Sequence, residues 1–97
     1  MKINSYSFGK MKINEREYTS DLIIHQNEIY DSWWREEGNM LYINDLFQVI
    51  DYIKDKLLIG TGKYGRMKVS EDLIDKLEER GKEIYIQQTD EAVNTFN

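Results

Sequence analysis

The chain has 97 residues and a mass of 11.6 kDa, with 40% apolar residues, 13 basic and 18 acidic side chains, and a net charge of -5. This length and apolar content predict one globular domain over residues 1–97, and the acidic balance excludes general nucleic-acid binding, which requires a basic face. Cysteine is absent and histidine occurs once, so we expect no disulfide, no metal site, no cofactor and no catalytic constellation built on several histidines or cysteines.

The first third of the chain is expected to form antiparallel strands. Four segments rich in β-branched and aromatic residues are separated by polar residues, and they cover residues 3–8, 10–14, 21–26 and 28–33. Met11 and Ile13 alternate with polar residues, which is typical of a strand with one face in water. Segments 14–16 and 26–28 are expected to form hairpin turns, which gives a β-meander.

A helix is predicted next. Asn44 can cap it, and its apolar residues recur three and four positions apart, at Leu46, Phe47, Val49, Ile50 and Ile53. A strand over residues 56–60 follows, and its centre, Leu57-Leu58-Ile59, is apolar without alternation, which is typical of a strand covered on both faces.

A βαβ unit is expected around the second helix. Ser70 supplies an N-cap oxygen for a helix over residues 70–80, and Gly81 can take the left-handed conformation that ends it. A strand over residues 83–87 would then run parallel to strand 56–60, with a right-handed connection. Thr89 is expected to cap a short C-terminal helix. The predicted class is α/β with an antiparallel addition.

Residues 60–65, Gly-Thr-Gly-Lys-Tyr-Gly, match the spacing G-x-G-x-x-G of dinucleotide-binding loops. In those loops the third glycine opens the helix, and an acidic residue near the end of the next strand holds the ribose. Here the helix is expected to begin near Glu71, and the next strand ends in Gln87 and Gln88. Since 97 residues are also too few for both halves of that fold, dinucleotide binding is disfavoured.

A smaller anion remains compatible with this loop. Residues 60–68 carry a charge of +3 and no acidic residue, whereas residues 21–59 and 69–97 each carry -5. Open α/β sheets bind ligands at the carboxyl ends of their parallel strands, where backbone N–H groups converge. Two interpretations stay open: a small-anion or carboxylate site, or glycines that only permit an unusual backbone path beside solvated charges. The candidate residues are Gly60, Thr61, Gly62, Lys63, Tyr64 and Arg66.

Trp33 and Trp34 form the second unusual feature. Consecutive residues on a strand point to opposite faces, so one indole is expected in the core and the other exposed or beneath a partner or ligand. Arg35 could stack on the exposed indole or bind a carboxylate. Trp34 and Arg35 are therefore further candidates, although a core tryptophan plus one covering a sheet edge is the simpler interpretation.

Segments along the whole chain together resemble the adipogenesis-associated Mth domain family. They are Ile-Asn-Ser-Tyr-Ser-Phe-Gly at 3–9, Glu-Tyr-Thr-Ser-Asp-Leu at 17–22, Trp33-Trp34-Arg35 with Gly38, Ile-Gly-Thr-Gly at 59–62 with Gly65, Met-Lys-Val at 67–69, and Thr89, Ala92, Val93, Phe96 and Asn97. The resemblance implies a compact three-layer α/β domain with a central mixed sheet and an additional β-hairpin or small sheet.

The family resemblance implies no defined activity. Members are small proteins of unassigned biochemistry, while animal relatives are linked to adipocyte differentiation and, in a mitochondrial branch, to assembly of respiratory complex I. Only the Gly-Thr-Gly loop carries over, onto Gly60, Thr61 and Gly62. The chain departs from the family pattern at Asn39, where a histidine is common, and at Ser70, where proline is common.

Two functions follow from these features. The first is a non-enzymatic protein-interaction or assembly module with an unknown protein partner, favoured by the shortage of nucleophiles and metal ligands. The second is a protein or enzyme that binds a small anionic ligand through the Gly-Thr-Gly loop with Trp34 or Arg35. Exposed aromatic residues are also compatible with a homodimer. Because the chain lacks a long uncharged apolar segment and a signal-peptide pattern, we expect a cytoplasmic protein that does not bind membranes.

Overall fold

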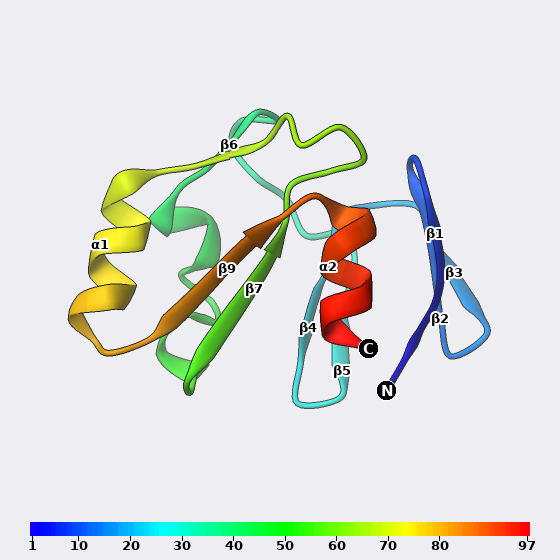
Figure 1. Ribbon diagram of the computed structural model, residues 1–97, viewed down its shortest axis with the longest axis horizontal. Coiled ribbons are helices and arrows are strands. Elements are labelled where there is room, and N and C mark those ends of the chain that lie inside the picture. Colours follow the sequence, from blue (N-terminus) through cyan, green and yellow to red (C-terminus); the bar gives the residue numbers. More distant parts are fainter.

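Two helices lie on opposite sides of a central pair of parallel strands in the computed structural model, which describes residues 1–97 (Figure 1). The strands are β7 (Lys56–Gly60) and β9 (Glu83–Gln87), and the helices are α1 (Glu71–Glu79) and α2 (Thr89–Phe96). β7 and β9 pair in parallel over their full lengths. The expected α/β class and βαβ unit are therefore confirmed. Neither helix is long and apolar enough to cross a membrane.

The expected antiparallel region is present, with one additional strand. Its strands are β1 (Ile3–Ser7), β2 (Lys10–Ile13) and β3 (Arg16–Tyr18) in one sheet, and β4 (Ile23–His25) and β5 (Glu28–Tyr30) in a separate hairpin. We did not predict β3. Asn14 and Glu15 both have positive φ angles, 51° and 71°, so they complete a two-residue turn and the chain pairs again at once, Ile13 with Arg16.

The fold class is confirmed, but the strands do not form the single central mixed sheet that the family resemblance implied. The strands form four separate sheets, and the parallel pair β6 (Met40–Leu41) and β8 (Lys68–Val69) is one of them. α2 lies between β7 and β1, as Figure 1 shows. Beyond the end of α2, the Asn97 side chain accepts from the Ile3 N–H and donates to the Ile3 carbonyl, each at 2.8 Å. The start of β1 therefore bonds to the C-terminal residue rather than to β7.

The helix predicted from Asn44 is also wrong. Two 3₁₀ turns replace it, η1 (Ile43–Leu46) and η2 (Ile50–Tyr52). The Trp33 indole Nε1 donates to the Asp45 carbonyl at 2.9 Å, and in an α-helix that carbonyl would accept from Val49. The Val49 N–H bonds instead to the Leu46 carbonyl at 2.9 Å, the shorter 3₁₀ spacing.

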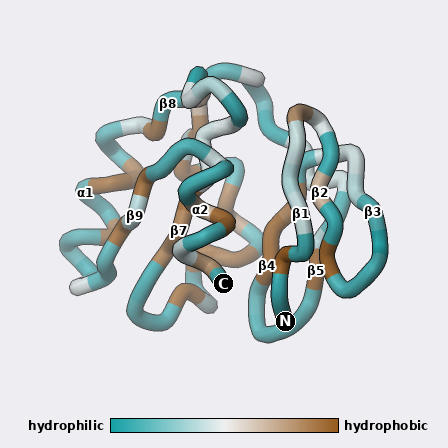
Figure 2. The backbone as a smooth tube through the Cα atoms, turned by 45° about the vertical axis from the view of Figure 1, so that its right-hand side comes forward, coloured by the Kyte–Doolittle hydropathy of each residue, from teal (hydrophilic) through white to brown (hydrophobic).

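The main core lies between α1, the 3₁₀ turns and the β7–β9 pair. Figure 2 shows hydrophobic residues concentrated where α1 faces β7 and β9. Leu73 and Leu77 of α1 are completely buried. The buried cluster consists of Leu41, Leu46, Val49, Ile59, Leu73 and Leu77. Because β7 contributes Ile59 to this cluster, the loop that follows β7 starts from a fixed position.

Replacing Ser70 by alanine is expected to lower the free energy of unfolding by about 1 kcal/mol. The Ser70 hydroxyl accepts the Leu73 N–H at 3.3 Å at the start of α1, and alanine leaves that donor without its cap. Thermal unfolding should show a midpoint lower by about 4–8 °C. Ser70→Asp, which keeps an acceptor at the same position, is the matched control. Equal midpoints for Ser70→Ala and the wild type would contradict a stabilising cap.

Candidate functional site

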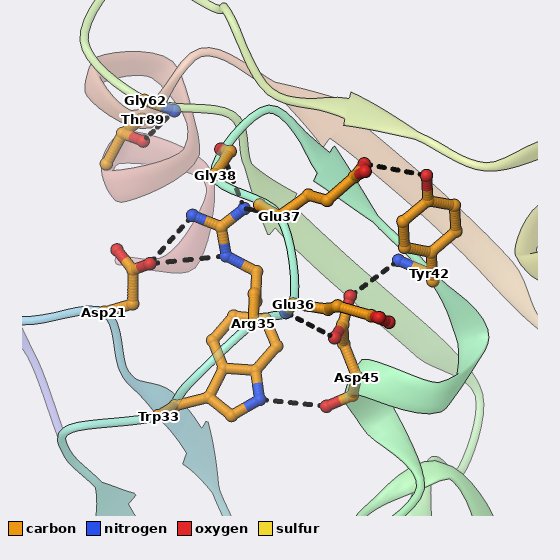
Figure 3. Close-up of polar contacts among 10 residues, drawn as sticks. All are labelled: Asp21, Trp33, Arg35, Glu36, Glu37, Gly38, Tyr42, Asp45, Gly62 and Thr89. Atoms are coloured by element: carbon orange, nitrogen blue, oxygen red, sulfur yellow. Dashed lines mark hydrogen bonds and ion pairs between the residues drawn. The ribbon is translucent and has the colours of Figure 1, made fainter.

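The Gly-Thr-Gly loop after β7 is bonded to the start of α2. The Thr61 N–H and hydroxyl both donate to the Gln87 carbonyl, at 2.8 and 3.1 Å. The Gly62 N–H donates to the Thr89 hydroxyl at 2.8 Å, and the Thr89 N–H donates back to the Gly62 carbonyl at 3.1 Å. We call Thr61, Gly62, Gln87 and Thr89 the clasp; Figure 3 includes its Gly62–Thr89 hydrogen bond. Thr61 is buried, with 7% of its surface exposed.

Thr89 has a different role from the one expected. The N-cap of α2 is Gln88, without a side-chain cap hydrogen bond, while the Thr89 hydroxyl serves the clasp. The position of Thr89 also explains the need for glycine at residue 60. A Cβ atom on Gly60 would lie 2.9 Å from the Thr89 hydroxyl oxygen and 3.4 Å from its Cα. Close approach between β7 and α2 therefore depends on Gly60.

The clasp uses groups that an anion would need. The N–H groups of Thr61 and Gly62 both donate within the protein, so neither is free to bind a ligand without breaking a hydrogen bond. Among the basic side chains, the Lys63 ammonium lies 2.9 Å from the Asp90 carboxylate. The hydrogen bond and charge of Asp90 raise the pKa of Lys63, as expected for an ammonium group paired with a carboxylate.

Beside the clasp, aromatic and basic side chains from two segments meet on the surface. The rings of Phe8 and Tyr64 have centroids 5.9 Å apart, and they are 73% and 64% exposed. The Arg66 guanidinium lies 5.6 Å from the Tyr64 ring centroid, and the Lys63 ammonium lies 6.0 Å from that of Tyr6. We call this group the ring patch: Tyr6, Phe8, Lys63, Tyr64 and Arg66.

Sequence reasoning missed the β1–β2 side of the ring patch. Phe8 occupies the turn between β1 and β2, just before Gly9, whose φ angle is 74°. Figure 1 shows the tip of this hairpin on the same side of the molecule as the loop after β7. An aromatic residue in a hairpin turn has no strand partner to cover it. Phe8 next to Gly9 was therefore the sequence feature that could have indicated an exposed ring here. Nothing in the sequence indicated that Tyr64 would lie beside it.

Trp33 and Trp34 have the opposite environments that were expected, although neither lies in a strand. Trp33 packs against the main core and Trp34 is 77% exposed. The guanidinium of Arg35 lies 5.8 Å from the ring centroid of Trp33, so Arg35 stacks on the core indole and not on the exposed one. The alternation argument therefore separated the two indoles correctly but assigned the arginine to the wrong ring.

The donors of Arg35 are used within the protein (Figure 3). Its Nη2 lies 2.8 Å from the Asp21 carboxylate, and its Nη1 donates to the carbonyls of Glu37 and Gly38 at 3.1 and 3.0 Å. The side chain is 12% exposed. These contacts join residue 21 to the segment before β6, and none of them reaches the Gly-Thr-Gly loop. The structure thus groups Gly60, Thr61, Gly62, Lys63, Tyr64 and Arg66 in one loop, and Arg35 bonds elsewhere.

Together the fold and this site define a small α/β domain whose glycine loop is closed by its C-terminal helix and borders an exposed ring patch. A family model described as a protein of unknown function, DUF498/DUF598, matches residues 3–97, and the chain belongs to this family. The crystal structure of a conserved hypothetical protein from Pyrococcus horikoshii is similar, with a TM-score of 0.84 and 25% identity over 99% of this chain and 86% of that chain. No curated protein matches the chain. The narrower Mth assignment stays a prediction.

Proposed function

We propose that the domain is a protein-interaction module and that the ring patch is its contact surface. The observation that carries the proposal is the Phe8–Tyr64 pair, two large rings that contact each other while most of their surface faces solvent. Aromatic residues and arginine are enriched at protein–protein interfaces, and an aromatic ring buries a large area at low entropic cost. The clasp fixes the start of the loop that carries Tyr64 and Arg66, which reduces the ordering cost of binding.

The charge of the ring patch indicates the chemistry of the partner. Arg66 is exposed and forms none of the four ion pairs, whereas Lys63 is paired with Asp90. We therefore expect a partner surface with an apolar centre and a carboxylate at its rim. The apolar centre would cover the two rings, and the carboxylate would bind the Arg66 guanidinium over the Tyr64 ring.

The alternative, a protein or enzyme that binds a small anion, has less support. It requires the amides of Thr61 and Gly62, and these already donate within the clasp. It also requires positive charge, but the ammonium charge of Lys63 is already paired with the Asp90 carboxylate. Arg35, the other basic candidate, bonds to Asp21 and to backbone carbonyls. No specific contact in the loop favours this second function.

The double variant Phe8→Ser with Tyr64→Ser is expected to lose partner binding by at least about tenfold, because each buried aromatic anchor contributes about 1–2 kcal/mol or more. Affinity purification with the tagged wild type from the source cells, followed by titration with the purified partner, measures this loss. Phe47→Ser is the matched control, since Phe47 is 71% exposed and lies outside the ring patch. Equal loss in Phe47→Ser, or full binding by the double variant, would overturn the ring patch as the contact surface.

A further inference from the structure

One edge of β9 has no neighbouring strand. β9 pairs only with β7, and on that side the Glu83 N–H donates to the Asp55 carbonyl and the Gln87 carbonyl accepts the Thr61 N–H, both at 2.8 Å. Backbone groups of successive residues alternate between the two sides of a strand. The N–H and C=O groups of Ile84 and Ile86 therefore point to the open edge.

An open groove lies between this edge and α1. Its volume is about 410 Å³, and its apolar wall is formed by Ile74, Ile84, Tyr85 and Ile86, while Glu78, Lys82 and Glu83 also line it. Ile86 is 45% exposed and Tyr85 is 38% exposed. Isoleucine and tyrosine favour extended backbone, and an uncovered edge with such residues is a template for another strand.

The outer edge of β3 is less suited to pairing. β3 is only three residues long and carries Arg16 and Glu17, charges that discourage edge pairing. In β9 the three central residues, 84–86, are uncharged, and the charged Glu83 lies at the end. β9 therefore offers an uncharged edge at residues 84–86 beside a groove with an apolar wall.

We propose that two copies of this chain associate through the open edges of β9, antiparallel about a two-fold axis at Tyr85. This register places Ile84 opposite the partner's Ile86, so that the outward N–H and C=O groups of both isoleucines form four hydrogen bonds across the axis. Glu83 lies opposite the partner's Gln87, so no two carboxylates face each other. Because the sequence Glu-Ile-Tyr-Ile-Gln is nearly symmetric about its centre, the edge is complementary to a second copy of itself.

The result is a continuous four-stranded sheet of two β7–β9 pairs. Each chain also extends the apolar wall of the other's groove, since its isoleucines come beside Ile74 and Ile84. In Figure 1, β7 and α2 separate this edge of β9 from the tip of the β1–β2 hairpin that carries Phe8. The dimer therefore leaves the ring patch free, and the two proposals are independent.

A single introduced cysteine tests the register. The chain contains no cysteine, so Tyr85→Cys adds the only thiol. Directly opposite residues of a pair without mutual hydrogen bonds have Cα atoms about 4.5 Å apart, within the range of a disulfide. Mild oxidation of Tyr85→Cys should give a covalent dimer, whereas Phe47→Cys and Tyr64→Cys, both at more exposed sites, should stay largely monomeric under denaturing electrophoresis. Equal crosslinking of all three variants would overturn the register.

Sedimentation equilibrium tests the dimer without a crosslink. We expect the wild type and Phe47→Lys to be dimeric, and Ile86→Lys to be monomeric with an unchanged circular dichroism spectrum, because it adds a charge at an already exposed position. A wild type that stays monomeric up to hundreds of micromolar would overturn the proposal, as would a dimeric Ile86→Lys. Binding of some other extended chain to a monomeric wild type would assign the edge to that chain and equally overturn the dimer.

Discussion

Replacing Arg35 by methionine is expected to lower the free energy of unfolding by about 1.5–3 kcal/mol in total, the contribution of one hydrogen bond to a charged group, because water can replace the guanidinium at the exposed partner oxygens. The variant loses the Asp21 ion pair at 2.8 Å and the bonds to the carbonyls of Glu37 and Gly38, while keeping an apolar stem against Trp33. Urea unfolding followed by circular dichroism measures the change.

Two further variants separate this effect from a general loss of charge. Arg66→Met removes an exposed arginine, and we expect its stability to stay within about 0.5 kcal/mol of the wild type. Arg35→Lys should remain destabilised, because an ammonium group cannot reproduce the planar fork that reaches a carboxylate and two carbonyls together. Wild-type stability of Arg35→Met would contradict a stabilising role for these contacts.

Replacing Thr89 by valine is expected to lower the free energy of unfolding by about 1–3 kcal/mol, the cost of leaving a partly buried donor without its partner. Valine keeps the shape of threonine but removes the hydroxyl that accepts the Gly62 N–H at 2.8 Å. Amide exchange of Gly62 should accelerate in parallel. Thr95→Val is the matched control on the same helix, because the Thr95 hydroxyl bonds only to an exposed Gln87 side-chain oxygen.

Gly60→Ala tests the same contact from the other side. Its Cβ would lie 2.9 Å from the Thr89 hydroxyl, so α2 must shift. In a double-mutant cycle, Thr89→Ala should relieve part of the cost of Gly60→Ala, since it removes the oxygen that the new methyl group meets. Additive effects of the two substitutions would contradict direct packing between Gly60 and Thr89.

Local signals were sufficient for the βαβ unit. Strand 56–60, the Ser70 cap and the stop at Gly81, whose φ angle is 75°, all lie where the sequence placed them. Each depends on residues within a few positions, so the pattern contains the necessary information. The fold class was therefore predictable without knowledge of the tertiary contacts.

Distant contacts decided the elements that were predicted wrongly. The Trp33 indole N–H donates to the Asp45 carbonyl, and 3₁₀ turns form where a helix was expected. Threonine is a residue type that often caps helices, but the Thr89 hydroxyl instead accepts the Gly62 N–H, and Gly62 lies far away along the chain. Local periodicity cannot predict either contact, because each joins residues that are distant in the sequence.

The position of the glycine loop after β7 was predicted, but its tertiary contacts were not. The sequence located the loop with Gly60, Thr61 and Gly62 and its basic residues, and the structure keeps them together. The pairing of Lys63 with Asp90 and the contact of Phe8 with Tyr64 both depend on tertiary structure. Because of these contacts, the structure favours a closed loop beside exposed rings over an open, charged loop that binds an anion.

Two-dimensional NMR of the amide signals of Phe8 and of residues 60–66 most directly distinguishes a closed clasp from an open anion site. The protein is titrated first with inorganic phosphate and then with the purified partner. We expect the amides of Thr61 and Gly62 to stay unchanged in phosphate, and the signals of Tyr64 and Phe8 to shift saturably with the partner. Saturable shifts of the Thr61 and Gly62 amides in phosphate, with no response of Tyr64 and Phe8 to the partner, would contradict the clasp and the ring patch together.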